Sequence, residues 1–207
     1  TQISKKEIEP TYLDISIIDR FSKNYRSNNF IKVLTSIFTR EQVSFIINTY
    51  QIGTVNTWPG PGATVFWQID NENRLRSGKI LLYNETTGKR VKDPYPHITW
   101  YHKTAKLKNF NLSQCLFGLH LINEKPYSPI SIVESEKTAC IMSVLLPKTT
   151  WMATGSLSNI NDRMFDPIYH RDIILYPDAS ISEDNTNNCF DRWSEKAELL
   201  RRKGYSI

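Results

Sequence analysis

An α/β pattern begins with Ile130-Ser-Ile-Val-Glu134-Ser-Glu-Lys-Thr-Ala139, a short apolar run that stops at an acid. Trp151-Met-Ala-Thr-Gly155 follows, and Asp172-Ile-Ile-Leu-Tyr-Pro-Asp178 is a second apolar run that ends at an acid. Strands that alternate with helices predict parallel pairing with right-handed crossovers. In an open α/β sheet, such runs deliver charges to the carboxyl edge, where ligands and metals bind. We therefore expect an open parallel sheet with flanking helices over residues 129–207.

The chain before this unit divides into a helical part and a β-rich part. Residues 14–57 carry apolar side chains at spacings of three and four, and Thr39-Arg-Glu-Gln42 is a capping box ahead of a helix that we expect to end at Gly53. Trp58-Pro-Gly-Pro-Gly62 has the composition of a turn. We therefore expect a helical segment over 1–57 and a basic β-rich subdomain over 58–128, an α+β protein overall.

The β-rich part predicts an antiparallel meander of two or three strands. Residues 64–70 alternate and are rich in aromatics, residues 74–83 return as a second strand, and residues 89–92 are a candidate third. Residues 111–122 fit either a short helix or a turn followed by a strand.

A final helix closes the α/β unit. Its signals are a cap at Asn187 or Asn188, an end at Gly204, and an apolar stripe of Phe190, Trp193, Ala197 and Leu200. Residues 205–207 look like the beginning of another strand, so we expect the unit to be truncated at its C-terminal side.

Composition favours a folded protein without a membrane span. The chain has 207 residues, 40% of them hydrophobic, and a net charge of +5. Its apolar runs are too short for a membrane span, and its first residues lack a signal-peptide profile, so we expect a cytoplasmic protein. Nine basic residues against two acidic ones fall within residues 74–108, which points to a nucleic-acid partner for this segment.

The residues that could bind zinc are too scattered to predict a zinc site. Cys115, Cys140 and Cys189 show no Cys-x-x-Cys spacing, and we expect buried thiols. The four histidines also lack the spacing of metal ligands, so we assign none to a metal.

Taken in order, several segments resemble the catalytic core of bacterial DNA primases, which contains a Toprim domain. The similar stretches are Phe66-Trp-Gln-Ile-Asp70-Asn-Glu-Asn-Arg74-Leu-Arg-Ser-Gly78, Leu116-Phe-Gly-Leu119, Ile132-Val-Glu134, Met152-Ala-Thr-Gly-Ser156 and Ile174-Leu-Tyr-Pro-Asp178. The stretch Glu-Ser-Glu-Lys-Thr-Ala, which begins at Glu134, resembles still more closely the corresponding stretch of the primase-like Toprim proteins of Bacteroidetes and their mobile elements. The resemblance covers roughly residues 30–205 and implies a metal-dependent phosphoryl-transfer fold.

The chain departs from the primase pattern at the metal site. Of the four acids that the resemblance implies, Glu134 and Asp178 are present, whereas Thr138 and Ser180 stand at the other two positions. Two carboxylates suffice for one Mg²⁺ or Mn²⁺ but are too few for a two-metal clamp. Glu183 and Asp184 are near enough in sequence to substitute for the missing acids. Glu134 and Asp178 are therefore the candidate metal ligands.

The candidate functional residues form two groups. Glu134, Asp178 and Lys137 are the candidate catalytic residues. The candidate nucleic-acid ligands are Arg74, Arg76, Lys79, Lys89, Arg90 and Lys92, and they are interleaved with Tyr83, Tyr95, Trp100 and Tyr101. Basic residues that follow a backbone, with aromatics that stack on bases, are typical of a groove for single-stranded DNA or RNA. For each group the alternative is an ordinary solvated surface.

Three functions remain open at this point. The first is an active Mg²⁺-dependent nucleotidyltransferase of the primase type. The second is a Toprim-like module with a degraded metal site that binds single strands, or a replication or mobilisation protein. The third is a structural module of a mobile-element protein. The replaced acids favour the second function, and the basic middle segment disfavours the third.

Overall fold

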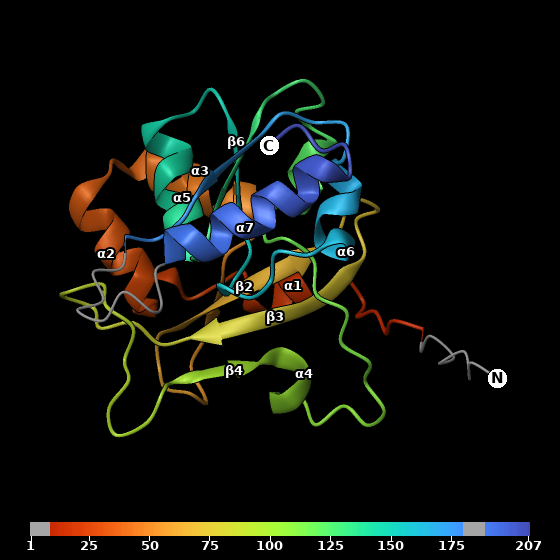
Figure 1. Cartoon of the computed structure of the whole chain (residues 1–207). Helices are drawn as coiled ribbons and strands as arrows, with labels where there is room; N and C mark the ends of the chain where they lie inside the picture. Colours follow the sequence, from red (N-terminus) through yellow and green to blue (C-terminus); the bar gives the residue numbers. More distant parts are fainter. Residues whose placement is uncertain (1–8, 180–188) are drawn as a thin grey trace.

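The protein has a mixed α/β fold built on two sheets (Figure 1). The computed structural model describes residues 9–179 and 189–207. One sheet is antiparallel with the order β1-β2-β3-β4, and the other is parallel with the order β6-β5-β7. The strands are β1 Gly53–Val55, β2 Ala63–Ile69, β3 Leu75–Leu81, β4 Ile98–Trp100, β5 Ile130–Val133, β6 Thr150–Ala153 and β7 Ile173–Tyr176.

Helices cover both sheets and connect the parallel strands (Figure 1). The described α-helices are α1 Ile17–Phe21, α2 Asn29–Ile37, α3 Arg40–Tyr50, α4 Tyr101–Thr104, α5 Glu136–Leu145, α6 Asp162–Phe165 and α7 Cys189–Arg202. Short 3₁₀ turns lie at Tyr25–Ser27, Leu119–Ile122 and Asp166–Ile168. None of the helices in the described part of the chain has the length and apolar character needed to cross a membrane.

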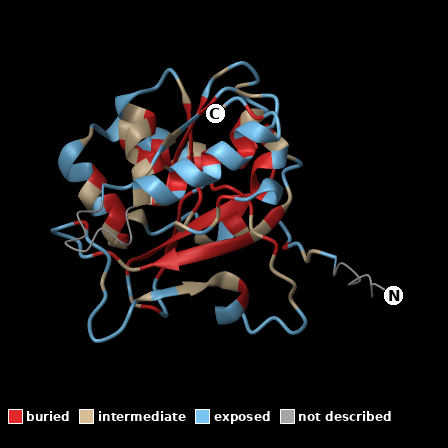
Figure 2. Cartoon of the chain, viewed as in Figure 1, coloured by how far each residue is buried: buried red, intermediate tan, exposed pale blue. Residues whose placement is uncertain are grey.

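The core is continuous from one sheet to the other. Every residue of β2 is buried, and Figure 2 shows that burial follows the strands while the outer helix surfaces are exposed. Phe66 of β2 packs edge-on against Phe117, which stacks on Tyr50 of α3. The Tyr50 hydroxyl donates a hydrogen bond to the carbonyl oxygen of Trp151 in β6, at 2.9 Å. These aromatic contacts thus help to join the parallel sheet to the antiparallel one within a shared core.

The parallel register brings three strand ends to one edge of the sheet. Val133 at the end of β5 pairs with Ala153 of β6 on one side and with Tyr176 of β7 on the other. Glu134 and the residues after Ala153 and Tyr176 therefore leave the sheet at the same edge, which is the place predicted for a ligand site. The expected parallel sheet with flanking helices and the antiparallel sheet beside it are both confirmed.

Several element boundaries differ from the sequence prediction. The helical segment ends at Tyr50, where Gln51 takes a left-handed conformation, and Gly53 begins strand β1 instead of ending a helix. The further strand of the meander is β4 rather than residues 89–92. Residues 79–81 of β3 pair with β4, and the 89–92 segment forms an isolated bridge between Arg90 and Tyr83 instead of a strand.

The C-terminal helix also corrects one prediction. Trp193, Ala197 and Leu200 are buried as expected, but Phe190 is 61% exposed. Phe190 lies in the first turn of α7 and lines a surface groove beside β7 instead of entering the core. The predicted caps, Asn187 and Asn188, lie outside the described residues.

Two other predicted segments take an irregular form. Residues 205–207 form no strand, although the carbonyl oxygen of Ser206 accepts a hydrogen bond from the Ile173 amide. Residues 119–122 make a 3₁₀ turn next to a bridge between Phe117 and Ala153, a mixture of the two forms that the sequence left open.

Candidate functional site

A cavity of about 430 Å³ lies at the carboxyl edge of the parallel sheet. We call it the edge pocket and define it by its charged lining residues, which are Lys79, Lys89, Arg90, Lys92, Glu134, Glu136, Lys137 and Asp178. Lys79 comes from β3 of the antiparallel sheet, and Lys89, Arg90 and Lys92 come from the segment between β3 and β4. The parallel unit supplies the three acids and Lys137. Both sheets therefore build the pocket.

The structure brings Glu134 and Asp178 together in this pocket. Glu134 directly follows β5, and Asp178 lies two residues after β7. Partial burial raises the pKa of Glu134 above its ordinary value, and the charge of Asp178 raises it further, against the opposing effects of Arg90 and Lys79. The ionised form of Glu134 is therefore disfavoured both by burial and by the neighbouring carboxylate. The two candidate acids thus belong to one pocket, as their positions at the ends of neighbouring strands predicted.

A buried ion pair forms the floor of the pocket. The Lys79 ammonium donates hydrogen bonds to both carboxylate oxygens of Glu136, at 2.9 and 3.2 Å, and to the carbonyl oxygen of Gly155 at 2.6 Å. Both side chains are nearly inaccessible to solvent, at 7% and 3% exposure. Lys79 is therefore not a free cation for nucleic acid, and its role is to join β3 to α5 and to the end of β6.

Gly155 gives this ion pair its space. Its φ of +74° lies in the left-handed region, and a Cβ there would approach Oε1 of Glu136 to 2.9 Å. Its amide donates to the carbonyl oxygen of Glu134 at 2.9 Å. The glycine thus fixes the backbone of Glu134 while it leaves room for the carboxylate of Glu136.

Glu136 is a site residue that the sequence analysis did not select. It lies two residues after Glu134, and its acid could be explained as an ordinary first-turn residue of a helix. One signal in the sequence could have identified it. Glu136 lies three and four residues before Ala139 and Cys140, so it shares the apolar, buried face of α5, where a charged residue is unusual.

Lys137 occupies the side of the pocket. Its ammonium donates to the carbonyl oxygen of Gly88 at 2.9 Å and lies 5.7 Å from the centre of the Tyr83 ring. Burial lowers the pKa of Lys137, as does the nearby Arg90, while Asp178 opposes them. Lys137 therefore holds the turn that precedes Lys89 and Arg90, and it contributes positive charge to the pocket at the same time.

Three exposed cations stand at the mouth of the pocket. Lys89, Arg90 and Lys92 are exposed and follow a turn that is closed by hydrogen bonds to Asn84. Because these side chains reach solvent beside the acids, they can meet a phosphate that approaches the pocket.

Arg74 and Arg76 lie apart from the edge pocket. The guanidinium groups of both donate to the buried carboxylate of Asp70, at 2.9 and 2.8 Å, and both lie over the Tyr12 ring. Burial opposes ionisation of Asp70, but hydrogen bonds from the two arginines and from nearby backbone amides outweigh it and hold its pKa below the ordinary value. These two residues therefore stabilise the turn between β2 and β3.

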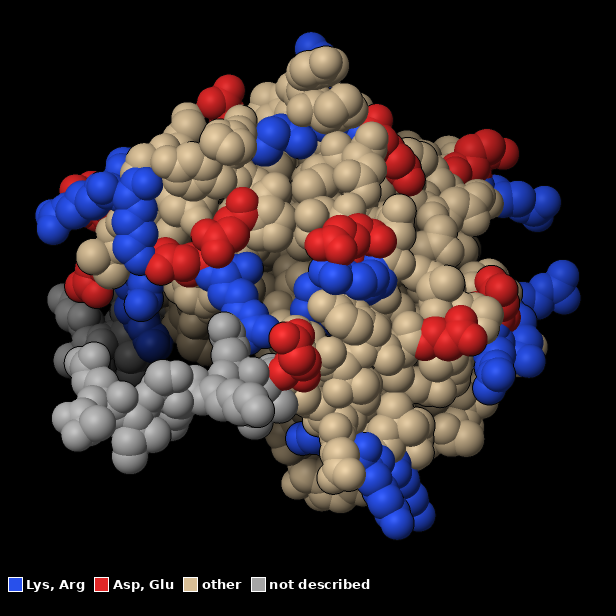
Figure 3. All heavy atoms as spheres, turned by 90° about the vertical axis from the view of Figure 1, so that its right-hand side faces the viewer, with Lys and Arg blue, Asp and Glu red and all other residues tan. Residues whose placement is uncertain are grey.

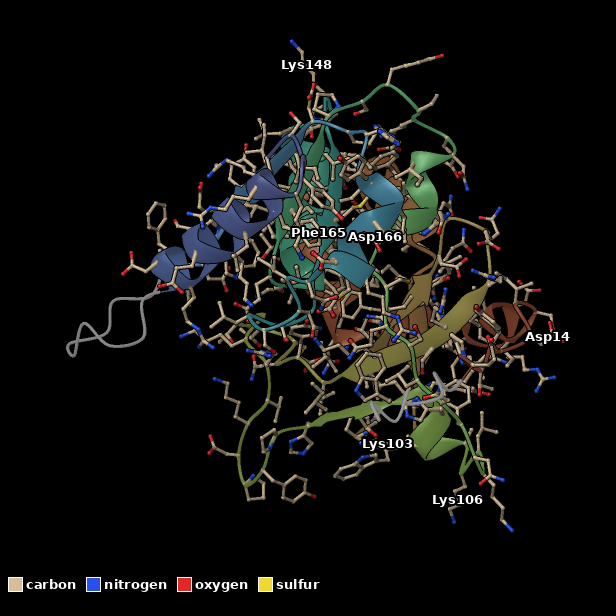
Figure 4. The ribbon with its side chains drawn as sticks, turned by 45° about the vertical axis from the view of Figure 1, so that its right-hand side comes forward. Asp14, Lys103, Lys106, Lys148, Phe165 and Asp166 are labelled. Carbon is tan, nitrogen blue, oxygen red and sulfur yellow. The ribbon has the colours of Figure 1, made fainter. Side chains whose placement is uncertain are left out.

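Two other cations of the basic segment, Lys103 and Lys106, do not line the pocket. Lys103 belongs to α4 and Lys106 follows it, and both lie at the opposite end of the molecule from Lys148 (Figure 4). On the face shown in Figure 3, Lys and Arg side chains are interspersed with Asp and Glu.

The aromatic residues that were predicted to stack on bases lie in different environments. Tyr83 is buried under Lys137, and Tyr101 packs edge-on against Trp67 and Phe21 in the core. Trp100 is half-buried in β4. Tyr95 is 48% exposed and is the member of this set with a largely open ring.

The acids available for a metal are few. Within residues 9–179 and 189–207, no group of three or more His, Cys, Asp and Glu side chains is arranged to hold a metal ion. Thr138 lines the pocket without adding a carboxylate, whereas Ser180, Glu183 and Asp184 lie outside the described residues. Cys115 and Cys140 are buried thiols, and burial raises the pKa of Cys115 to about 12. Of the three acids that line the pocket, Glu136 is paired with Lys79, so Glu134 and Asp178 are the two whose carboxylates are not engaged by that ion pair.

Comparisons with known proteins give a family. No curated protein matches the chain. A crystal structure of a DNA primase domain from Pseudomonas aeruginosa is similar at 13% identity, with a TM-score of 0.43 over 79% of this chain. The match spans 50% of that primase domain. The model of the family described as "Domain of unknown function (DUF6371)" matches residues 28–179. This match covers well over half of the sequence, and the chain therefore belongs to the DUF6371 family.

Proposed function

We propose that the edge pocket binds the phosphate backbone of single-stranded DNA or RNA. The observation that carries this proposal is the arrangement of Lys89, Arg90 and Lys92, which are exposed at the mouth of a cavity that also contains an acidic pair. Cations that neutralise phosphates release counterions, and this release supplies most of the affinity of sequence-independent binding. A cavity with acids alone would repel a nucleic acid.

The acidic pair gives the same pocket a second property. One Mg²⁺ or Mn²⁺ held by Glu134 and Asp178 would relieve their mutual repulsion and offer a further positive charge to a phosphate. Mg²⁺ is commonly held by one or two carboxylates together with substrate phosphates. The ion would supply charge neutralisation to the bound phosphate, and Lys137 would stand beside it.

A role in DNA replication or in mobile elements is the biological setting that we propose. It rests on the ordered primase-like motifs of the sequence, from Phe66 to Asp178. In that setting the chain acts as a single-strand-binding module with a reduced metal site, and replication or mobilisation proteins are its proposed partners.

Catalysis of the primase type is a second candidate, favoured by a separate observation. Glu134 and Lys137 share one pocket, and burial moves the pKa of each toward neutrality. Perturbed acids and bases that meet in a cleft are typical of active sites. An assay with template, nucleotides and Mn²⁺ tests this candidate, with Glu134→Gln as the control. Because two of the expected acids are replaced, we expect little or no primer synthesis.

Fluorescence anisotropy with a labelled oligothymidylate at low salt tests the binding proposal. The variant Lys89→Gln/Arg90→Gln/Lys92→Gln should bind at least about tenfold more weakly than the wild type, because three phosphate contacts are lost. The matched control is Lys103→Gln/Lys106→Gln, which removes two exposed charges of the same basic segment outside the pocket. Equal affinities for the two variants would contradict the proposal.

A further inference from the structure

We propose that Trp58, Tyr95 and His97 form a stacking platform for the bases of the single strand whose phosphates enter the edge pocket. This inference rests on the proposed function and adds a base-binding subsite to it. The three rings form a cluster on the surface, in which Tyr95 stacks on His97 with centroids 4.9 Å apart. Trp58 lies 5.6 Å from Tyr95 and 6.0 Å from His97.

The two largest rings of the cluster remain open to solvent. Trp58 is 47% exposed and Tyr95 is 48% exposed, whereas Trp67, Trp151 and Trp193 are buried in the cores. Burying large aromatic rings is favourable, so two of them side by side on a surface indicate a binding site. Aromatic faces are the part of a single-strand site that stacks on bases of any sequence.

The backbone fixes the cluster to the cationic segment. The His97 amide donates to the carbonyl oxygen of Val91 at 3.1 Å, and the Leu82 amide donates to the carbonyl oxygen of His97 at 3.1 Å. Val91 lies between Arg90 and Lys92, so the rings and the cations of the pocket mouth belong to one hydrogen-bonded unit. The turn that carries Trp58 rests on the same unit, because a Cβ at Gly60 would come within 2.9 Å of Leu82.

A second cavity lies against His97 of the aromatic cluster and shares lining residues with the edge pocket. It has a volume of about 170 Å³ and is lined by Pro96, His97 and Ile98 on one side. Its lining also includes Val91 and three residues that line the edge pocket as well, Leu81, Arg90 and Lys92. The same cations can therefore hold a phosphate while an adjacent base reaches the rings, which is the arrangement of a single-strand groove.

The nature of the occupant follows from this combination of charge and rings. The edge pocket is lined by five cations and three acids, so its charged lining has a positive balance that favours an anionic partner. A single strand offers a phosphate for the cations and an unpaired base for the rings in every nucleotide. Because the rings make no base-specific hydrogen bond in this account, we expect binding without sequence preference.

The test compares an oligothymidylate with an abasic oligonucleotide of the same length and charge. Wild type should bind the oligothymidylate more tightly by about 5- to 150-fold for each stacked base. The variant Trp58→Ala/Tyr95→Ala should bind both oligonucleotides with the wild-type affinity for the abasic one. The matched control is Tyr127→Ala, which removes an aromatic side chain that is 96% exposed elsewhere on the surface. Unchanged melting temperatures would show that the variants fold.

Tryptophan emission gives a second readout. Stacking of a base on Trp58 should quench the emission when the oligothymidylate binds, but not when the abasic strand binds. Trp58→Phe should keep the affinity and lose this quenching.

Each contrary outcome has a distinct meaning. Equal wild-type affinity for the two oligonucleotides would overturn the platform and leave the phosphate-binding proposal intact. An equal loss of both affinities in the Trp58→Ala/Tyr95→Ala variant would assign the rings a structural role and overturn the platform as well. Failure of the wild type to bind either oligonucleotide at low salt would overturn the proposed function together with the platform.

Discussion

Lys79 of β3 and Glu136 of α5 form a buried ion pair that fastens the antiparallel sheet to the parallel unit beneath the edge pocket. The carbonyl oxygen of Gly155, just beyond β6, accepts a third hydrogen bond from the Lys79 ammonium. Strands and a helix that are distant in the sequence thus meet at one ammonium group. The pocket depends on this contact for its shape, because its walls belong to both sheets.

Replacement of Lys79 by methionine should strongly destabilise the fold. The variant leaves the Glu136 carboxylate buried without its partner, which costs about 3–5 kcal/mol. Urea unfolding measures this loss, and Lys79→Met/Glu136→Leu should recover most of it because no buried charge remains. Lys32→Met is the matched control, since it breaks an exposed pair with Glu85 and should cost no more than about 1 kcal/mol. Similar losses in the two single variants would contradict a structural role for the buried pair.

Glu134→Gln should stabilise the protein at neutral pH. Folding raises the pKa of Glu134 above its ordinary value of 4.5, so the folded protein holds this proton more tightly than the unfolded chain does. The wild type therefore loses stability as the pH rises from about 4.5 through the folded pKa, whereas the variant does not. Melting temperatures between pH 4 and 8 should diverge in favour of the variant as the pH rises. The exposed Glu195 supplies the control Glu195→Gln, which should show no such divergence. A variant that is less stable than the wild type at pH 7 would refute this electrostatic account.

Gly155→Ala should destabilise the protein and disturb the floor of the pocket. The left-handed backbone costs an alanine about 1–3 kcal/mol, and the new Cβ would crowd the Glu136 carboxylate. Chemical denaturation should show this loss, while Ser158→Ala on the same loop should change little because Ser158 is exposed. A neutral Gly155→Ala would mean that the loop moves freely around the ion pair.

Mg²⁺ or Mn²⁺ should bind weakly and with a stoichiometry of one. Two carboxylates leave most of the six coordination positions to water, so a preformed two-ion site is not expected. Titration calorimetry measures the stoichiometry, and Asp178→Asn should abolish the heat of binding. Asp172→Asn is the control, because Asp172 lies at the other end of β7. Tight binding of two ions by the wild type would show that further ligands complete the site.

The sequence predicted the parallel unit well because its signals are local. Apolar runs that end at Glu134 and Asp178 specify both the strands and the edge at which the acids emerge, and the structure places the two acids in one pocket. Capping residues such as Thr39 similarly fixed the start of a helix, where the Thr39 side chain accepts from the Gln42 amide.

The distribution of the cations could not be predicted because it depends on long-range contacts. In sequence Arg74, Arg76, Lys79 and Arg90 form one basic stretch. The fold assigns two of them to Asp70 and one to Glu136, which leaves Arg90 with its neighbours at the mouth of the pocket. The role of Glu136 could not be predicted for the same reason, because its partner Lys79 is 57 residues away in the sequence.

The salt dependence of oligothymidylate binding tests the central claim most directly. For single strands, the logarithm of the affinity falls with the logarithm of salt concentration by about 0.7 for each phosphate that the protein neutralises. We expect Lys89→Gln/Arg90→Gln/Lys92→Gln to flatten this slope by about 2, while Lys103→Gln/Lys106→Gln leaves it at the wild-type value. A triple variant with the wild-type slope would place the phosphates elsewhere and contradict the edge pocket as the nucleic-acid site.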